Sequence, residues 1–432
     1  MISDPVLLLS TGAGFLLVLI ALHVPVGAAM AIAGVVGFGM MEGFGPSLST
    51  VAIETSSALS SADLATIPVF LLMGSLAARA RLSRDIYDLA NAFIGHWQGG
   101  LAISTIAGCA GFGALCGSSL ATTATMARIA LPEMRKRGYS SELAAGSIAS
   151  GGGLGILIPP SIIMVIYAVL TEQFVLDLFI AGILPGILAV CLYWITIGIV
   201  VRIRPGAGTT AEKADWSQRF RAVARAWRAL VIIAAVTGGI YAGVFTVLEA
   251  ASVGAGLTFL FFLATPNEGR LNAIIEVLTE TARSTGMIFL MVIGANLFSY
   301  FLTISGAAEE VVAAVSASEL NAYVIVALIL LMYLVFGAIF DSVAAMVLTL
   351  PFVFPLILQL GFNPIWWGII NVMIIEIGLI TPPIGMNVFV MHGVAEEIPL
   401  KTIFRGITPF LLADIVRVAL MVTFPRIALA LV

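Results

Sequence analysis

Composition indicates that this chain of 432 residues is an integral membrane protein. Hydrophobic residues make up 60% of it and charged residues only 10%, whereas a typical soluble domain contains about 25% charged residues. So few charges cannot cover the surface of a soluble protein of this size, and a formal net charge of -4 gives no reason to expect a nucleic-acid partner.

Apolar segments long enough to cross a bilayer, which takes about 20 residues, recur along the chain. The first follows an N-terminus without the basic residues of a signal peptide, so we expect it to be retained as a helix. Two amphipathic stretches, Glu42–Asp63 and Asn267–Arg283, are predicted to lie along the membrane surface as arms. The predicted spans lie near residues 6–22, 25–41, 66–79, 178–201, 229–247, 249–265, 285–303 and 406–424.

Four further apolar segments are interrupted. The stretches near 100–131 and 320–359 have glycine, serine or aspartate at their centres. We predict that they form re-entrant helical hairpins, which enter and leave the membrane on one side. The stretches near 141–169 and 363–392 each contain an interruption rich in glycine and proline, so they are predicted to be broken helices.

The two halves of the sequence repeat each other. Gly113–Ser118 aligns with Gly337–Ser342, 224 positions later. Gly155–Pro160 aligns with Gly378–Pro383 at an offset of 223. Separate blocks that keep one offset within a single residue indicate an internal repeat. The predicted halves are residues 1–201 and 229–432, joined by a basic cytoplasmic linker at 202–228.

The distribution of charge predicts how the halves are oriented. The loop after the first hairpin carries four basic residues, whereas the matching loop near 352–362 has none. The arginines at 79–84 likewise have an acidic counterpart, Glu309 and Glu310. Because basic loops stay on the cytoplasmic side, the halves are predicted to be upside down relative to each other. The alternative, two parallel repeats, would put basic loops on both faces.

Inverted repeats with broken helices are typical of secondary transporters, which bind solute near the bilayer midplane where the repeats meet. A hairpin tip or an unwound helix leaves backbone groups unpaired unless they line a cavity or bind something. Freed carbonyl groups can replace the hydration shell of Na⁺, and the N-termini of half-helices attract anions. We therefore expect ion and solute binding at the two tips and the two breaks.

Three charged residues near these places have competing interpretations. Asp341 is an ionisable group deep in the membrane, which marks a functional site by default, although it could instead hold neighbouring amides. Glu376 has two equally good explanations, a role in the functional site and a hydrogen bond across helices. Arg128 follows the first tip by ten residues, about 15 Å along a helix, and is expected to extend to the membrane interface rather than hold substrate.

The chain also contains five distinctive motifs, at Gly111–Thr122, Pro132–Tyr139, Gly155–Ser161, Phe179–Gly186 and Gly378–Asn387. Together these motifs resemble the large membrane subunit of tripartite ATP-independent periplasmic (TRAP) transporters, and the match spans essentially the whole chain. The resemblance implies an elevator, in which a transport domain of two hairpins and two broken helices slides against a scaffold under a sodium gradient. It also implies a separate four-helix small membrane subunit and a periplasmic binding protein that delivers an organic acid.

The resemblance carries Ser118 and Ser119 to the first tip, Asp341 and Ser342 to the second tip and Thr381–Asn387 to the second break, and the other expected ligands are taken from the tips and breaks themselves. The expected sodium ligands are Gly117, Ser118, Asp341, Ser342, Gly378 and Thr381. The expected substrate ligands are Ser119, Thr122, Pro160, Ser161, Gly385 and Asn387. No catalytic residue and no other metal site is expected, because the sequence shows no nucleophile–base pair and no spacing of metal ligands.

The sequence therefore predicts an all-α polytopic membrane protein with inverted repeats, two re-entrant hairpins and two broken helices, divided into an elevator-type scaffold and transport domain. We expect sodium-coupled import of a small organic acid anion across the bacterial inner membrane, with Na⁺ as the coupling ion, no organic cofactor and no nucleotide-binding motif. An alternative is a stand-alone Na⁺/carboxylate symporter without a binding protein. Sialic acids, C4-dicarboxylates, other sugar acids and compatible solutes all remain open as substrates.

Overall fold

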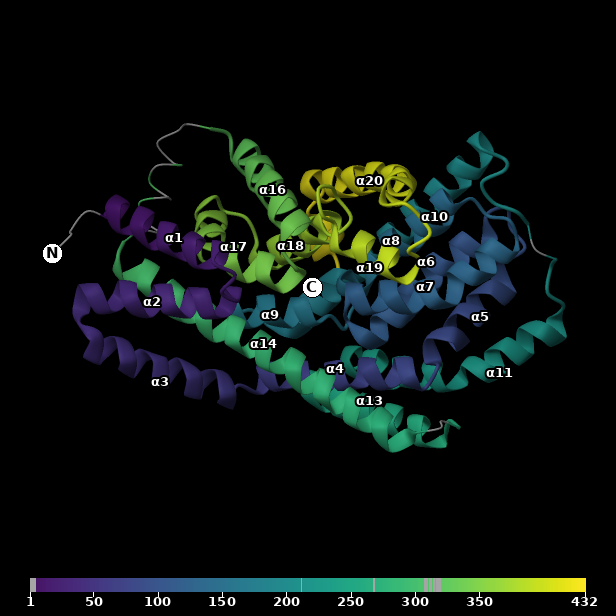
Figure 1. Ribbon diagram of the computed structural model, residues 1–432, viewed down its shortest axis with the longest axis horizontal. Coiled ribbons are helices and arrows are strands. Elements are labelled where there is room, and N and C mark those ends of the chain that lie inside the picture. The colour runs from purple at the N-terminus through teal and green to yellow at the C-terminus, as the bar shows by residue number, and fades with distance from the viewer. Residues whose placement is uncertain are drawn as a thin grey trace.

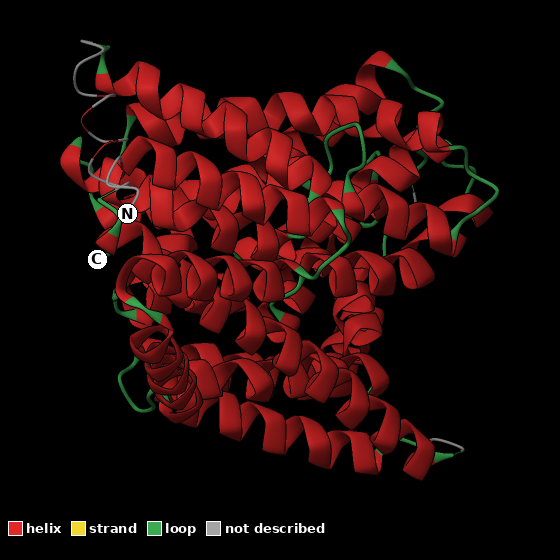
Figure 2. Cartoon of the chain, turned by 60° about the vertical axis from the view of Figure 1, so that its left-hand side comes forward, coloured by secondary structure: helices red, strands yellow, loops and turns green. Residues whose placement is uncertain are grey.

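The computed structural model is helical throughout the part of the chain that it describes. These described residues are 5–210, 212–266, 269–306 and 320–432, together with 310, 313 and 315. Figure 2 shows helices joined by loops, and no strand occurs in these ranges. Predicted features that involve Met1–Asp4, Asn267 or Glu309 lie outside the described residues.

In the first half of the chain, several helices precede the first hairpin. They are α1 (Pro5–Ala21), α2 (Val26–Glu42), α3 (Phe44–Ser60), α4 (Ala62–Arg79) and α5 (Leu82–Ile94). The hairpin consists of α6 (Gly100–Cys116) and α7 (Ser119–Lys136). The first broken helix consists of α8 (Ser141–Leu157) and α9 (Ile162–Thr171), and the long helix α10 (Val175–Ile203) follows.

The second half begins with α11 (Trp216–Ile233), which continues through a π-helical turn, η1 (Ala234–Gly238), into α12 (Gly239–Tyr241). Two helices, α13 (Val247–Ala264) and α14 (Arg270–Ile304), come before the second hairpin. The hairpin, the second broken helix and the last helices are α16 (Ala322–Ile339), α17 (Ser342–Gln359), α18 (Pro364–Gly378), α19 (Met386–Val394), α20 (Leu400–Thr423) and α21 (Arg426–Leu429).

Eight of the described helices are long and apolar enough to cross a membrane, and the bent pair α8 and α9 makes a ninth if it is counted as one span. Six of the eight coincide with predicted spans, and the other two are α16 and α17 of the second hairpin. The first two predicted spans are α1 and α2, each of 17 residues. The prediction of an all-helical, polytopic membrane protein is confirmed.

Most of the described helices can be assigned to two groups by their packing (Figure 1), while α5, α11, η1 and α12 lie outside both. The framework consists of α1–α4, α13 and α14, in which the long helix α14 packs along α2 and α4, and α13 packs on α4. The hairpin bundle consists of α6–α10 and α16–α21. In this bundle α6, α7 and α20 all pack on α8, and α16 packs on α18. Each hairpin therefore lies against the broken helix of its own half.

Glycines allow this close approach at matching positions in the two halves. A Cβ atom on Gly113 of α6 would lie 2.7 Å from the Cα atom of Gly155 on α8. A Cβ atom on Gly378 of α18 would lie 2.6 Å from the Cα atom of Gly337 on α16. Such backbone contact is a main source of helix association in a membrane, where apolar side chains gain little by leaving lipid.

Three elements differ from the sequence-based expectations. The later part of the predicted linker at 202–228 is helical, because Asp215 and Gln218 form a reciprocal capping box that starts α11 at Trp216. The predicted arm at 267–283 is not separate from the span after it. From Arg270 on, the arm and the span both belong to α14, whose 35 residues extend about 50 Å without a proline to interrupt them. The helix α5 is not predicted from the sequence, because its 13 residues are fewer than the roughly 20 that identify a membrane span in a sequence.

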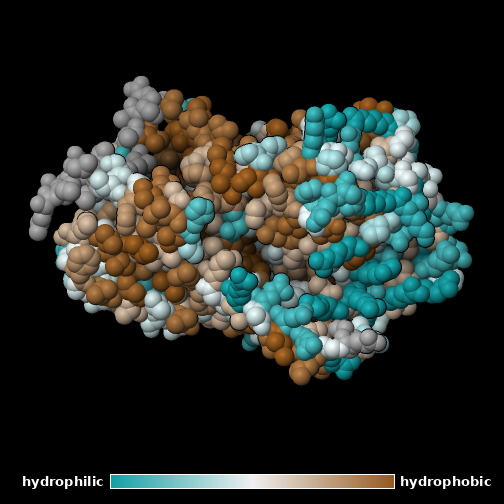
Figure 3. Space-filling view, in the orientation of Figure 1, coloured by the Kyte–Doolittle hydropathy of each residue, from teal (hydrophilic) through white to brown (hydrophobic). Residues whose placement is uncertain are grey.

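Polar and apolar surfaces separate along the molecule. Figure 3 shows hydrophilic residues over the end that holds α5 and α11, and a largely hydrophobic surface over α2 and α3. Basic residues of this hydrophilic end form ion pairs between elements, including Arg204 with Glu142 at 2.7 Å and Arg228 with Asp85 at 3.0 Å. We call it the basic end, and the positive-inside rule predicts that it faces the cytoplasm.

The glycine contacts give a first prediction. Replacing Gly113 with alanine forces α6 away from α8, because the new methyl group meets backbone atoms that cannot rotate aside. We expect Gly113→Ala to destabilise the protein by about 1–3 kcal/mol, measured by thermal unfolding in detergent. Gly198→Ala on α10 is the matched control, since its methyl group meets no atom within 4 Å. Equal unfolding temperatures for the two variants would contradict the contact.

Candidate functional site

The first hairpin tip lies against the first helix break. Gly117 ends α6 with a φ of +60°, and Ser118 then caps α7 by accepting a hydrogen bond from the Ala121 N–H. A Cβ atom on Gly117 would lie 3.2 Å from the carbonyl oxygen of Pro160. A side chain here would crowd the break, and glycine also tolerates the positive φ.

The remaining predicted residues of the first half are buried around this contact. Ser119 is the first residue of α7, and Thr122, one turn on, donates to the Ser118 carbonyl at 2.8 Å. Pro159 and Pro160 are joined by a cis peptide bond where α8 and α9 meet at an angle of 41°. The Ser161 hydroxyl donates to the Ile156 carbonyl at 2.5 Å across this break. The Ser161 hydroxyl thus pairs with a carbonyl group at the break, whereas the Ser118 carbonyl accepts both the hydroxyl and the backbone N–H of Thr122.

The second hairpin tip is built differently. Asp341 caps α17, and its Oδ1 atom accepts the N–H groups of Val343 at 3.0 Å and Ala344 at 3.1 Å. Ser342 follows as the first residue of α17, and both side chains are half-buried. The capping role matches the structural interpretation of Asp341, but one oxygen is enough for the cap. Both capping bonds are made by the Oδ1 atom alone.

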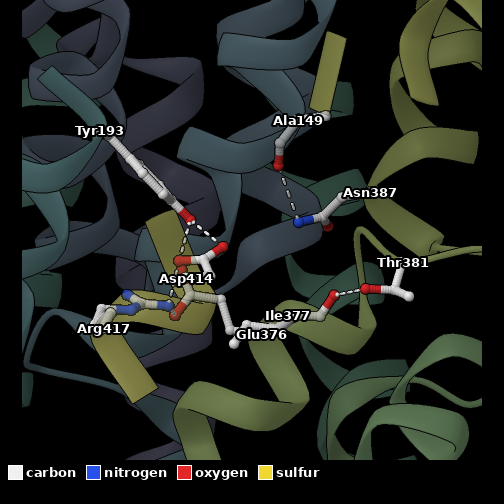
Figure 4. Close-up of polar contacts among 8 residues, drawn as sticks. All are labelled: Ala149, Tyr193, Glu376, Ile377, Thr381, Asn387, Asp414 and Arg417. Carbon is white, nitrogen blue, oxygen red and sulfur yellow. Dashed lines mark hydrogen bonds and ion pairs between the residues drawn. The ribbon is translucent and has the colours of Figure 1, made fainter. Parts of the chain in front are cut away.

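The second helix break, residues 379–385, contacts the second tip directly. The Gly385 N–H donates to the Ala338 carbonyl at 3.2 Å, and Gly385 itself has a φ of +65°. The Thr381 hydroxyl donates to the Ile377 carbonyl at 2.7 Å, as Figure 4 shows. Gly378 ends α18 in contact with Gly337. All four predicted sodium ligands of the second half thus lie at one tip and its break.

Asn387 connects the two halves. Its side-chain amide donates to the Ala149 carbonyl on α8 at 3.3 Å (Figure 4). Its backbone N–H donates to the Leu379 carbonyl at 3.0 Å. Its Oδ1 atom is buried and has no hydrogen-bond partner among the described residues. Because α19 also packs on α7, the second break lies beside the first hairpin. The predicted residues therefore form two tip–break pairs that meet around α19.

The donor atoms at these pairs are mainly hydroxyl and carbonyl oxygens, with the single carboxylate of Asp341. Within the described ranges, no group of three or more histidine, cysteine or acidic residues is arranged to hold a metal ion. A site of this composition suits a weakly held monovalent cation better than Zn²⁺ or a redox metal, which require imidazole, thiolate or several carboxylates.

Sequence reasoning missed a buried ionic network next to the second break. The Arg417 Nη2 atom lies 2.9 Å from Glu376 Oε2 and 2.9 Å from Asp414 Oδ1, and the Tyr193 hydroxyl donates to Asp414 at 2.9 Å (Figure 4). These side chains are at most 1% exposed. Glu376 therefore bonds across helices, from α18 to α20. A signal was present, because Asp414 and Arg417 lie one turn apart in an apolar segment, where unpaired charges are rare.

Comparisons with known proteins agree on one family. A family model described as the tripartite ATP-independent periplasmic transporter, DctM component, matches residues 13–427. The C4-dicarboxylate TRAP transporter large permease protein DctM of Pseudomonas aeruginosa is 36% identical over 386 residues, which cover 89% of this chain and 90% of that protein. The ectoine TRAP transporter large permease protein TeaC of Halomonas elongata is 30% identical over 413 residues, 96% of each chain.

A solved structure shares the fold at low sequence identity. The YdaH transporter of Alcanivorax borkumensis, described as having an unusual topology, superposes with a TM-score of 0.63. The superposition covers 89% of both chains at 16% identity. At this identity the likeness concerns the arrangement of helices alone.

The ionic network gives a second prediction. Replacing Arg417 with methionine leaves two carboxylates buried without their cation, so we expect Arg417→Met to lower the free energy of unfolding by about 3–5 kcal/mol. Arg405→Met, on the exposed side of the same helix, should change it little. Thermal unfolding in detergent measures both. A triple variant that adds Glu376→Gln and Asp414→Asn should regain part of the loss, and no regain would show that charge is not the cause.

Proposed function

This chain belongs to the DctM component family of tripartite ATP-independent periplasmic transporters, and from that premise we propose that it imports a small organic acid anion by sodium-coupled secondary active transport. It is a multi-pass permease subunit of the bacterial inner membrane and not an enzyme. The observation that carries the proposal is the contact between each hairpin tip and a helix break. Each contact gathers backbone carbonyls and hydroxyls inside an otherwise apolar bundle.

Sodium is the proposed coupling ion because the oxygens at the tip–break pairs are mostly uncharged. Carbonyl groups at unwound helices are the usual ligands of Na⁺ in secondary transporters. If two Na⁺ accompany one monoanion, one net charge moves inward. A membrane potential of 100 mV then supplies about 2.3 kcal/mol, or roughly fifty-fold accumulation, before the sodium gradient is counted.

The proposed mechanism is an elevator, in which the hairpin bundle moves against the framework. The division of most described helices into these two groups supports it, as does the long helix α14, which packs mainly along α2 and α4. The proposed inverted repeat is supported by the two pairs of glycines, Gly113 with Gly155 and Gly337 with Gly378, which occupy matching sequence positions.

The proposed partners are a separate small membrane subunit of four helices and a periplasmic protein that delivers the solute. The word tripartite in the family description supports both, and it favours this assembly over a stand-alone Na⁺/carboxylate symporter. Relatives of this chain are named for C4-dicarboxylates and for ectoine, so we propose a small carboxylate-bearing solute. Uptake that proceeds equally well without any binding protein would favour the stand-alone symporter.

The position of Asp341 gives a third prediction, which separates its charge from its capping role. Asparagine is as good a helix cap as aspartate, so Asp341→Asn keeps the hydrogen bonds to Val343 and Ala344 while removing the charge. Loss of a charged ligand should raise the sodium concentration for half-maximal uptake on the order of tenfold. Uptake is measured in proteoliposomes that contain the small subunit and the cognate binding protein.

Asp215→Asn provides the matched control, because Asp215 caps α11 by the same hydrogen bond but lies at the basic end. It should leave the sodium dependence unchanged. If Asp341→Asn also leaves it unchanged, Asp341 takes no part in the ion site and acts only as a helix cap.

A further inference from the structure

A cavity of about 390 Å³ separates the first hairpin from the framework helices α4 and α14. Its α7 wall begins at the hairpin tip with Ser118 and ends about 15 Å away at Arg128. The α7 residues between these two that line the cavity are Ala121, Ala124 and Thr125. Their spacing of three or four residues places the wall along one face of the helix, where every side chain before the arginine is small.

The opposite walls are also lined by small or polar side chains. From α4 they include Gly74, Ser75 and Ala78, and from α14 they include Thr281 and Ser284. The cavity is therefore lined by small and polar side chains together with Leu71 and Phe112, in a bundle whose interior is otherwise apolar, and we call it the passage. Its volume falls within the range of about 300–1,000 Å³ that small-molecule sites occupy.

Three charged residues line the passage, and only one of them is paired. Arg79 forms an ion pair with Glu276 at 2.7 Å. Arg128 on α7 and Glu280 on α14 face the cavity without an ion pair to any described residue. The Arg128 side chain is exposed, which is compatible with the expectation that it extends to the membrane interface, and it also lines the same cavity as Ser118. An unpaired guanidinium thus lies at the far end of a passage that starts at the candidate site.

We propose that this passage is the route by which the solute leaves the first tip toward the basic end, and that Arg128 binds the solute's carboxylate on the way. A guanidinium group presents two parallel N–H donors that match the two oxygens of a carboxylate. The passage leads toward the end of α7 that carries Arg135 and Lys136, the predicted cytoplasmic side. The inference rests on the proposed function in one respect, namely that the solute carries a carboxylate.

The test uses the charge of a small thiol reagent in place of the unidentified solute. Cys109, Cys116 and Cys191 are replaced by alanine, and Ala124→Cys places one thiol in the passage, one turn before Arg128. The full-length protein is treated with an anionic reagent, methanethiosulfonate ethylsulfonate, or with its cationic trimethylammonium analogue. Each rate is divided by the rate with a free thiol in solution.

We expect the anionic reagent to react roughly fivefold faster than the cationic one, because a nearby guanidinium attracts it. Arg128→Gln should abolish this preference and Arg128→Lys should keep it. Glu280→Gln should increase the preference, since it removes the one unpaired negative charge on the opposite wall. Lys136→Gln is the matched control, because it removes a positive charge from the same helix outside the cavity and should change nothing.

A cysteine at position 124 that does not react would show that no aqueous passage exists. A preference that survives Arg128→Gln would show that Arg128 does not attract anions there. Either result overturns the inference. Because the labelling needs neither sodium nor solute, its failure is distinguishable from a failure of sodium-coupled import, which the Asp341→Asn uptake experiment detects separately.

Discussion

A polypeptide that leaves its helical path inside a membrane must find new partners for its backbone, because lipid offers none. This constraint shapes all four irregular segments of the chain. The Ser161 hydroxyl pairs with the Ile156 carbonyl, Gly385 donates to Ala338, and the Asp341 carboxylate holds two amides of α17. The second tip and its break share one such bond, from Gly385 to Ala338, whereas the first tip and its break are in close contact at Gly117.

The same constraint explains the distribution of glycine and of buried charge. Backbone groups at a tip can reach a break only if the helices that carry them nearly touch, and Gly113 with Gly155 and Gly337 with Gly378 permit this contact. The network of Glu376, Asp414 and Arg417 then fixes the helix that leads into the second break against α20. An elevator of the kind proposed would move these contacts as one body, and this keeps the tip–break pairs intact while their access to water changes.

Much of this organisation can be predicted from the sequence because glycine, proline and serine mark irregular backbone within apolar runs. Hairpins at 100–136 and 322–359, and breaks after Leu157 and Gly378, occur where these residues cluster. Other features depend on contacts between distant segments, which no local pattern reveals. Tyr193 and Asp414 are 221 positions apart, and the passage beside Arg128 exists only because α4 and α14 face α7. The sequence shows which residues at a site carry hydroxyl groups. It does not show which of these groups, such as the hydroxyl of Ser161, are already hydrogen-bonded to the backbone.

The central proposal, two inverted halves that bring their tips together from opposite sides, is tested most directly by labelling the outer ends of the two hairpins. Lys136 ends α7 and Gln359 ends α17, at matching positions of the repeat, and both side chains are exposed. Single cysteines at these positions, in a background without other cysteines, are treated with a membrane-impermeant maleimide in intact cells and in everted vesicles. Inverted halves predict labelling of position 359 in intact cells and of position 136 only in everted vesicles. Labelling of both positions from the same side would contradict the inverted arrangement.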